Sequence, residues 1–466
     1  MMTRFGARFK IPDDWIATVR SMRTEEKFVS QDLETIISET AWYELAALFP
    51  PTPIVSTGAA PMYRVPSLDV ARAFATGKIE ELEFNLPASS WSIVERDRRG
   101  PIFVRGGPGT GKSLLGLYRA LHALDRPSML NRAAPRVLYA TFTRTLAEDA
   151  RGKVELLRGS VPPELEISTV DRLVEQYAPS THHTTYDDRI IAEGLHAVIA
   201  AVPALARFDA DFIRSEIENV IVARGLRSLD AYLAVSRTGR RQRLAQPDRR
   251  AVWSAYEGWT ASLAARGLRT LGEARISALA AVEHLDEAHR YDLVVVDEVQ
   301  DLTTTALGLT IGLARGEATS RDVTLVGDGG QSIYRSGFKW ADVGLRLGGG
   351  SVVTLETCER SSIEILRFAA ALAGRQPEEH DEDRSVTASR VGPRPRIVRN
   401  FPDREDQRAW LVGDLRERLR AVDARRIAII SRTKTELDRV REALTAAHIA
   451  CVDYGAADFH RRDAVR

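Results

Sequence analysis

The fold is decided by the stretch Leu293-Val294-Val295-Val296-Asp297-Glu298-Val299-Gln300-Asp301. Its first four residues are apolar and rich in valine, which is typical of a strand buried on both faces of a parallel sheet. Such a strand holds rigidly whatever stands at its carboxyl end, and here that is a pair of adjacent carboxylates. We therefore expect Asp297 to face a magnesium ion and Glu298 to face an attacking water molecule.

A phosphate-binding loop is predicted upstream, in Gly106-Gly107-Pro108-Gly109-Thr110-Gly111-Lys112-Ser113. This is the complete G-x-x-x-x-G-K-[ST] pattern, and a short apolar strand before it and an amphipathic helix after it supply the required context. The glycines let backbone N–H groups converge on phosphates, and the start of the helix adds its dipole. Lys112 would supply charge to the outer phosphates, and the Ser113 hydroxyl would ligate the metal. The expected cofactors are ATP and Mg²⁺.

Composition bounds the class of protein. The 466 residues suggest about three structural units, and the 44% apolar and 28% charged residues are ordinary for a soluble globular protein. A net charge of +1 means that any contact with nucleic acid must come from local patches. Two cysteines exclude a disulfide framework, and no apolar run resembles a signal peptide or a membrane span. We expect a cytoplasmic protein with no membrane contact.

Changes of pattern along the chain predict its domains. We expect a helical accessory region over 1–75, a first ATP-binding α/β domain over 76–373, a charged linker over 374–395 and part of a second α/β domain over 396–466. In the first domain the strand signal fades over about 175–290, which predicts an inserted helical subdomain. Its parallel strands are expected at 101–105, 136–142, 292–297, 322–327 and 351–355. In the last domain we expect a strand at 427–430, a helix at 434–447 and a strand at 449–454.

An arginine cluster within the helical subdomain allows two interpretations. Arg237-Thr238-Gly239-Arg240-Arg241-Gln242-Arg243 is followed by Arg249-Arg250 and by the aromatic residues Trp253, Tyr256 and Trp259. One interpretation is a surface that tracks nucleic-acid phosphates. The other is a solvated helix face whose aromatic residues are buried. The sequence favours neither.

The order of motifs resembles that of superfamily 1 DNA helicases of the UvrD/Rep/PcrA type, from about residue 80 to residue 466. Besides the phosphate loop, five blocks carry the resemblance: Thr141–Ala147 (TFTRTLA), Ser168–Leu173 (STVDRL), Asp297–Asp301 (DEVQD), Val326–Tyr334 (VGDGGQSIY) and Leu355–Ser361 (LETCERS). The resemblance implies a RecA-like P-loop NTPase sheet with an inserted helical subdomain and the beginning of a second RecA-like domain. It also implies an ATP-dependent helicase or translocase that acts on single-stranded or partly duplex DNA.

The resemblance assigns roles residue by residue. Glu298, Lys112, Gln331 and Arg360 are expected to be catalytic, with Glu298 as the base and the others near the γ-phosphate. Ser113 and Asp297 are expected to hold the metal. Phe142 is expected to stack on a DNA base, the alternative being an ordinary aromatic residue of the core. The remaining DNA contacts are expected from Thr141, Thr143, Arg144 and Tyr334.

The chain departs from the family at three points. Glu359 stands where the family has an aromatic residue that stacks on adenine, and Ser90 stands where it has a glutamine that reads adenine. The predicted second domain ends at Arg466, before the family's last motifs. We therefore expect a fragment, a split-gene product completed by a second polypeptide, or a degenerate copy. The alternative function is a nucleotide-dependent DNA- or protein-binding module with little turnover of its own.

Overall fold

The computed structural model describes the chain from residue 86 to residue 452 with gaps. The described residues are 86, 88–96, 100–125, 135–235, 237, 242–317, 320–328, 340–345, 351–373, 387–392, 395, 398, 401–424 and 427–452. The predicted N-terminal helical region and most of the predicted linker lie outside them. The chain divides into two compact units, Met1–Pro393 and Arg394–Arg466.

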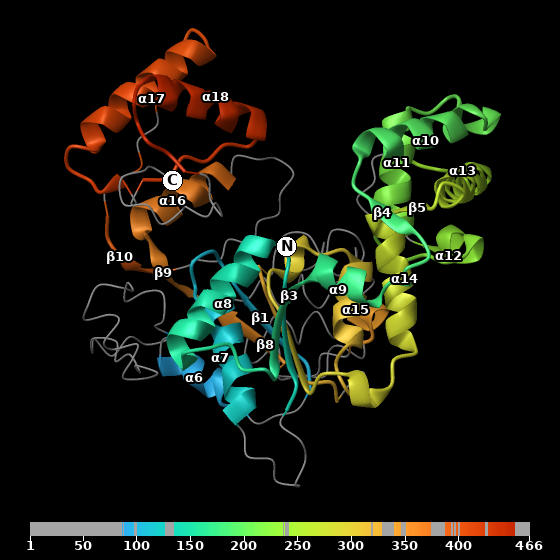
Figure 1. Ribbon diagram of the computed structural model, residues 1–466, viewed down its shortest axis with the longest axis horizontal. Helices are drawn as coiled ribbons and strands as arrows, with labels where there is room; N and C mark the ends of the chain where they lie inside the picture. The colour runs from blue at the N-terminus through green and yellow to red at the C-terminus, as the bar shows by residue number, and fades with distance from the viewer. Residues whose placement is uncertain are drawn as a thin grey trace, which may run out of the picture. The chain divides into compact units, whose positions relative to one another are not determined.

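A six-stranded parallel sheet is the framework of the first unit (Figure 1). Its spatial order is β3-β2-β6-β7-β1-β8. The strands are β1 (Ile102–Gly106), β2 (Val137–Thr141), β3 (Leu165–Thr169), β6 (Leu293–Val296), β7 (Val323–Gly327) and β8 (Val352–Leu355). The predicted α/β class with a parallel sheet is confirmed. β3 was not predicted, because Glu166 and Ser168 interrupt its apolar residues at the edge of the sheet.

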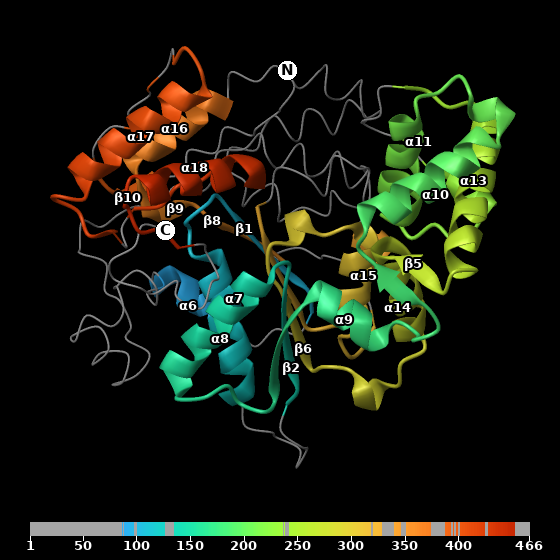
Figure 2. The ribbon, with the colours of Figure 1, turned by 45° about the horizontal axis from the view of Figure 1, so that its top comes forward.

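Helices cover both faces of this sheet (Figures 1 and 2). The first face packs against α6 (Ala88–Val94), α7 (Lys112–Asp125) and α8 (Arg144–Arg158), and the second against α9 (Val170–Tyr177), α14 (Leu271–Glu283) and α15 (Thr304–Gly312). In β6, Leu293 and Val295 belong to the first core and Val294 and Val296 to the second. This two-sided burial explains why the run has no alternating polar residue.

The helical subdomain is built between α9 and α14, as Figure 2 shows. Its elements are α10 (Asp188–Ala200), α11 (Ala210–Glu216), the π-helical segment η4 (Ile217–Val222), α12 (Leu229–Ala234), α13 (Gln246–Ala264) and the paired strands β4 (His183–Thr185) and β5 (Leu268–Thr270). Thr305 of α15 anchors it: the Thr305 hydroxyl donates to the Val222 carbonyl at 2.9 Å and its amide to the Ala223 carbonyl at 3.0 Å.

Two arginines of the predicted cluster are structural. Arg237 donates from Nε and Nη2 to the fully buried Glu216 carboxylate, at 2.6 and 2.8 Å. Arg249 donates from Nη1 to the carbonyls of Tyr232, Leu233 and Val235 at the end of α12. The hypothesis of a phosphate-tracking surface is therefore wrong for Arg237, because Nε, Nη1 and Nη2 all donate to groups inside the subdomain. For Arg249 the structure shows only that Nη1 is used there. The aromatic residues of α13 are buried, as the other interpretation requires.

The rest of the first unit follows β8. It comprises β9 (Thr357–Ser362), α16 (Ile363–Ala373) and β10 (Thr387–Arg390), with β9 and β10 paired in parallel. No helix among the described residues has the length and apolar character needed to span a membrane.

The second unit contains α17 (Arg404–Arg418) and α18 (Lys434–Ala446), packed around Leu415, Val440, Leu444 and Ile449. The strand predicted at 427–430 is not formed, and Ile430 is 91% exposed. A strand requires a neighbouring segment to complete its hydrogen bonds, and the described residues of this unit supply none. Whether this unit is part of a second RecA-like domain stays a prediction.

The Arg237–Glu216 pair yields a stability prediction. The Arg237→Met variant should lose ~3–5 kcal/mol in free energy of unfolding, because it leaves a buried carboxylate without its cation. Urea denaturation measures this loss. The control is Arg227→Met, which removes the partner of Glu283 in a half-exposed pair and should cost only ~0–1 kcal/mol. Equal effects of the two substitutions would contradict the prediction.

Candidate nucleotide and nucleic-acid site

The phosphate loop joins β1 to the start of α7, and its conformation requires glycine. Gly109 has φ +78°, in the left-handed region that other residues rarely adopt. A Cβ placed on Gly109 would also stand 2.8 Å from the Cβ of Arg360 and from Sγ of Cys358. Arg360, a predicted catalytic residue, follows Gly109 by 251 positions in the sequence. The structure thus brings it against the phosphate loop.

Lys112 is folded back onto the loop. Its Nζ donates to the carbonyls of Gly106 and Gly107, at 2.7 and 2.8 Å. Burial lowers the pKa of Lys112 below its ordinary value, while the nearby carboxylates of Asp328, Glu298 and Asp297 act in the opposite direction. The Lys112 ammonium is therefore a buried cation whose hydrogen bonds go to loop carbonyls. A bound phosphate could take the place of these carbonyls as the acceptor.

Asp297 joins the two halves of the site. It is almost completely buried directly after β6. Its Oδ1 accepts from the Ser113 hydroxyl at 3.1 Å and from the Glu298 amide at 3.0 Å, and its Oδ2 accepts from the Tyr139 hydroxyl at 2.8 Å. Burial, with the neighbouring Glu298 charge, raises the pKa of Asp297 to about 6, although these hydrogen bonds oppose the rise. Burial likewise holds the pKa of Tyr139 well above its ordinary value, so its hydroxyl remains a donor.

Glu298 is held in an unusual backbone conformation. Its φ of +54° and ψ of +47° lie in the left-handed region, which is rare for a residue other than glycine. The Glu298 carboxylate accepts from Nε2 of Gln300 at 2.5 Å, and Oε1 of Gln300 accepts from the Asp328 amide at 3.0 Å. Gln300 therefore connects the predicted base to the end of β7.

Ser113 and Asp297 suit Mg²⁺ in chemistry. They present a hydroxyl and a carboxylate oxygen at one point beside the phosphate loop. Mg²⁺ prefers oxygen ligands and is commonly held by one or two carboxylates together with substrate phosphates. No group of three or more His, Cys, Asp or Glu side chains forms a separate metal cage in the described part of the chain. The donor set thus fits a nucleotide-linked Mg²⁺.

The predicted DNA contacts divide by exposure. Phe142, just after β2, is 39% exposed, so it is not a core residue, and Arg144 is exposed at the start of α8. Thr143 is also exposed, and its hydroxyl accepts from the Leu146 amide as the cap of α8. Thr141 is fully buried and its hydroxyl lacks a hydrogen-bond partner among the described residues. A phosphate contact would require the Thr141 side chain to become exposed, and the role predicted for it stays a prediction.

The structure places both residues that stand where the family has adenine-reading side chains. Ser90 is buried in α6. Glu359 lies within β9, directly before Arg360. Gln331 and Tyr334 lie outside the described residues, so their predicted roles are not tested.

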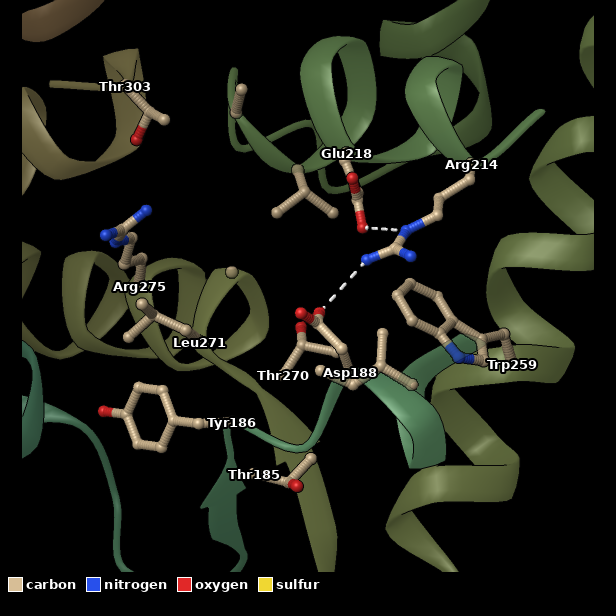
Figure 3. Close-up of a pocket in the computed structure, with 14 residues that line it drawn as sticks. Thr185, Tyr186, Asp188, Arg214, Glu218, Trp259, Thr270, Leu271, Arg275 and Thr303 are labelled. Carbon is tan, nitrogen blue, oxygen red and sulfur yellow. Dashed lines mark hydrogen bonds and ion pairs between the residues drawn. The ribbon is translucent and has the colours of Figure 1, made fainter. Parts of the chain in front are cut away.

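A cavity of about 290 Å³ lies at the helical subdomain, away from the phosphate loop (Figure 3). Figure 3 shows Arg214 between Asp188 and Glu218, and its Nε donates to Glu218 at 2.8 Å. Arg275, on another wall, pairs with Asp171 at 2.7 Å. Since these cations already have carboxylate partners, the cavity is a weaker phosphate site than the loop.

The contacts of two residues of the site could not be predicted from the sequence. Gln300 was recognised as part of a motif, but its link to Asp328 depends on the distance between β6 and β7. Tyr139 carried no signal, because an aromatic residue within an apolar strand is ordinary core composition.

Residues 86–347 match the family model of the UvrD/REP helicase N-terminal domain. The matched segment spans more than half of the chain and includes the phosphate loop, the acidic pair and the helical subdomain. The curated proteins searched for relatives yielded no match.

Gly327 gives a test of the packing around Gln300. A Cβ there would stand 2.5 Å from Oε1 of Gln300 and 2.6 Å from Cγ2 of Val299. We expect Gly327→Ala to lower the free energy of unfolding by ~1–3 kcal/mol through overpacking, as measured by urea denaturation. The control is Gly152→Ala in α8, where the added methyl meets no atom within 4 Å beyond the adjacent backbone of its own helix, and a gain of ~0.5–1 kcal/mol is expected. A Gly327→Ala protein as stable as the parent would show that this packing is loose.

Proposed function

The chain belongs to the UvrD/Rep helicase family, and from that premise we propose that it binds and hydrolyses ATP with Mg²⁺ and moves along single-stranded DNA. The observation that carries the proposal is the 3.1 Å hydrogen bond between Ser113 and Asp297. It joins the phosphate loop to the acidic pair across 184 positions of sequence. A phosphate cradle and a metal-binding carboxylate thereby occupy one place.

Each residue of the site has a proposed task. The loop amides and Lys112 bind the phosphates, and Ser113 and Asp297 hold Mg²⁺, which supplies charge neutralisation when bound. Water attacks the γ-phosphorus, the bond from that phosphorus to the bridging oxygen breaks, and the water proton passes to the Glu298 carboxylate. Arg360 stabilises the charge on the transferred phosphoryl group, and a planar fork of donors suits that task. Gln331, which follows β7 in the sequence, is proposed to help stabilise the same charge.

The DNA track is proposed on the exposed residues that follow β2. Phe142 offers a face for base stacking, and Thr143 and Arg144 offer contacts to phosphates. Tyr334 would join them from the segment after β7. Because β2 also carries Tyr139, which touches Asp297, one strand connects the DNA surface to the nucleotide site.

Two broader assignments accompany this function. The second unit is proposed as part of a second RecA-like domain. Its apolar run at 427–430 and the helix α18 follow one another in the sequence order of an opening βαβ unit, although the run is not a strand in this structure. A cytoplasmic location is proposed from the DNA substrate and from the small number of cysteines.

Hydrolysis tests the proposal directly. The purified chain should hydrolyse ATP, and single-stranded DNA should increase the rate. Lys112→Ala should abolish turnover, because it removes the positive charge that faces the phosphates. Glu298→Gln should abolish turnover by removing the base while leaving nucleotide binding in place. Phosphate release measures turnover, and binding of a fluorescent nucleotide measures affinity.

Binding without turnover under any condition would overturn the hydrolytic proposal for this chain. That result would favour the alternative, a nucleotide-dependent DNA- or protein-binding module. Turnover that both substitutions leave intact would place the active site elsewhere.

The DNA track has its own test. Phe142→Ala should weaken binding of a single-stranded oligonucleotide by ~1–3 kcal/mol, because one stacked base loses its aromatic face. Fluorescence anisotropy measures the affinity. The control is Leu156→Ala, which removes another exposed apolar side chain, 42% accessible, near the far end of α8. Unchanged affinity of the Phe142→Ala protein would exclude Phe142 from the track.

A further inference from the structure

Tyr139 reaches the centre of the nucleotide site from inside the sheet. Its side chain projects from β2 toward α7, and its hydroxyl donates to Oδ2 of Asp297 at 2.8 Å. The same hydroxyl lies 3.4 Å from the carbonyl oxygen of Ser113. A single phenol group thus contacts both residues that are proposed to hold the metal.

The site is built to admit this ring. Gly116 of α7 faces it, and a Cβ on Gly116 would stand 3.8 Å from Cε2 of Tyr139 and 3.1 Å from side-chain carbons of Val295 and Val326. Helix and sheet therefore approach closely, and Tyr139 is only 2% exposed. Filling this space requires a ring but no hydroxyl, since phenylalanine has nearly the same shape. Burying the hydroxyl is tolerated because it has an acceptor.

The hydrogen bonds to Asp297 divide between its two oxygens. Oδ1 takes the Ser113 hydroxyl and the Glu298 amide, and Oδ2 takes Tyr139. The torsion that turns a carboxylate about its last bond is soft. If only Oδ1 had donors, the carboxylate could still rotate about this bond. A donor to each oxygen fixes the plane of the group.

We propose that Tyr139 is a positioning residue for the carboxylate of Asp297, which would bind the metal. Tyr139 holds Oδ2, and the carboxylate is thereby fixed with Oδ1 directed to the Ser113 hydroxyl. This inference rests on the proposed function. It assigns to Tyr139 the role that outer hydrogen-bond partners have at metal sites, where they orient a ligand without touching the metal.

The test measures metal-dependent nucleotide binding and does not depend on turnover. A fluorescent ADP analogue is titrated with MgCl₂, and the Mg²⁺ concentration that gives half of the Mg²⁺-dependent change in affinity is determined. For Tyr139→Phe this concentration should rise on the order of 10-fold, the usual scale for loss of an outer partner. Affinity for the same analogue in EDTA should not change, because the phosphate cradle is intact.

The matched control is Tyr232→Phe. Tyr232 is also fully buried and also donates to a carboxylate, Oε1 of Glu216 at 3.0 Å, but within the helical subdomain. The Tyr232→Phe substitution should lower the thermal unfolding temperature, as is expected of Tyr139→Phe. It should leave the half-saturating Mg²⁺ concentration unchanged. In an Asp297→Asn background, Tyr139→Phe should produce no further shift in Mg²⁺ dependence, because its effect passes through that carboxylate.

The outcomes separate the inference from the proposed function. If the parent protein shows Mg²⁺-dependent binding and Tyr139→Phe shows the same half-saturating concentration, Tyr139 is a packing residue and only the inference fails. If the parent binds the analogue with no Mg²⁺ dependence, the proposed metal site fails and the inference fails with it. Tyr139→Leu, a second variant without the hydroxyl, should shift the concentration in the same direction and takes the place of a Tyr139→Phe protein that does not fold.

Discussion

One buried carboxylate, that of Asp297, is the constraint on which the site depends. Taking a charge out of water is unfavourable unless donors replace the lost hydration. Here a hydroxyl from α7, a phenol from β2 and the next backbone amide provide that replacement. Burial still raises the pKa of Asp297 to about 6. The donors therefore stabilise the Asp297 carboxylate only in part. A cation beside it would supply the remaining stabilisation, which is a physical reason for metal binding here.

The same carboxylate arranges what surrounds it. Asp297 accepts the amide of Glu298, whose left-handed backbone sends its carboxylate toward Gln300. Gln300 in turn accepts the amide of Asp328. The proposed base is therefore connected to the end of β7, which leads into the segment that contains Gln331 and Tyr334. A connection of this kind is a route by which nucleotide state and DNA contact could share one element, as coupling between two sites requires.

The helical subdomain shows how charge can serve structure. Arg237 and Arg249 lie in a cluster that by composition could bind phosphate, yet one neutralises buried Glu216 and the other caps the end of α12. Arg214 and Arg275, beside the cavity, have carboxylate partners as well. Arginines with free donors favour nucleic acid, and arginines with buried partners stabilise the fold. Composition alone does not separate these cases, because both use the same side chain.

The sequence by itself determined the parallel sheet, the phosphate loop and the acidic pair, since these are local patterns whose apolar runs and glycine spacing allow few other conformations. It missed β3, whose polar residues are tolerated at an edge, and it predicted a strand at 427–430 that lacks a neighbour. Only the tertiary structure decided that Thr141 is buried, that Arg237 pairs with Glu216 and that Tyr139 donates a hydrogen bond to Asp297. Each of these depends on the distance and direction between groups far apart in the chain, and the order of residues does not contain that information.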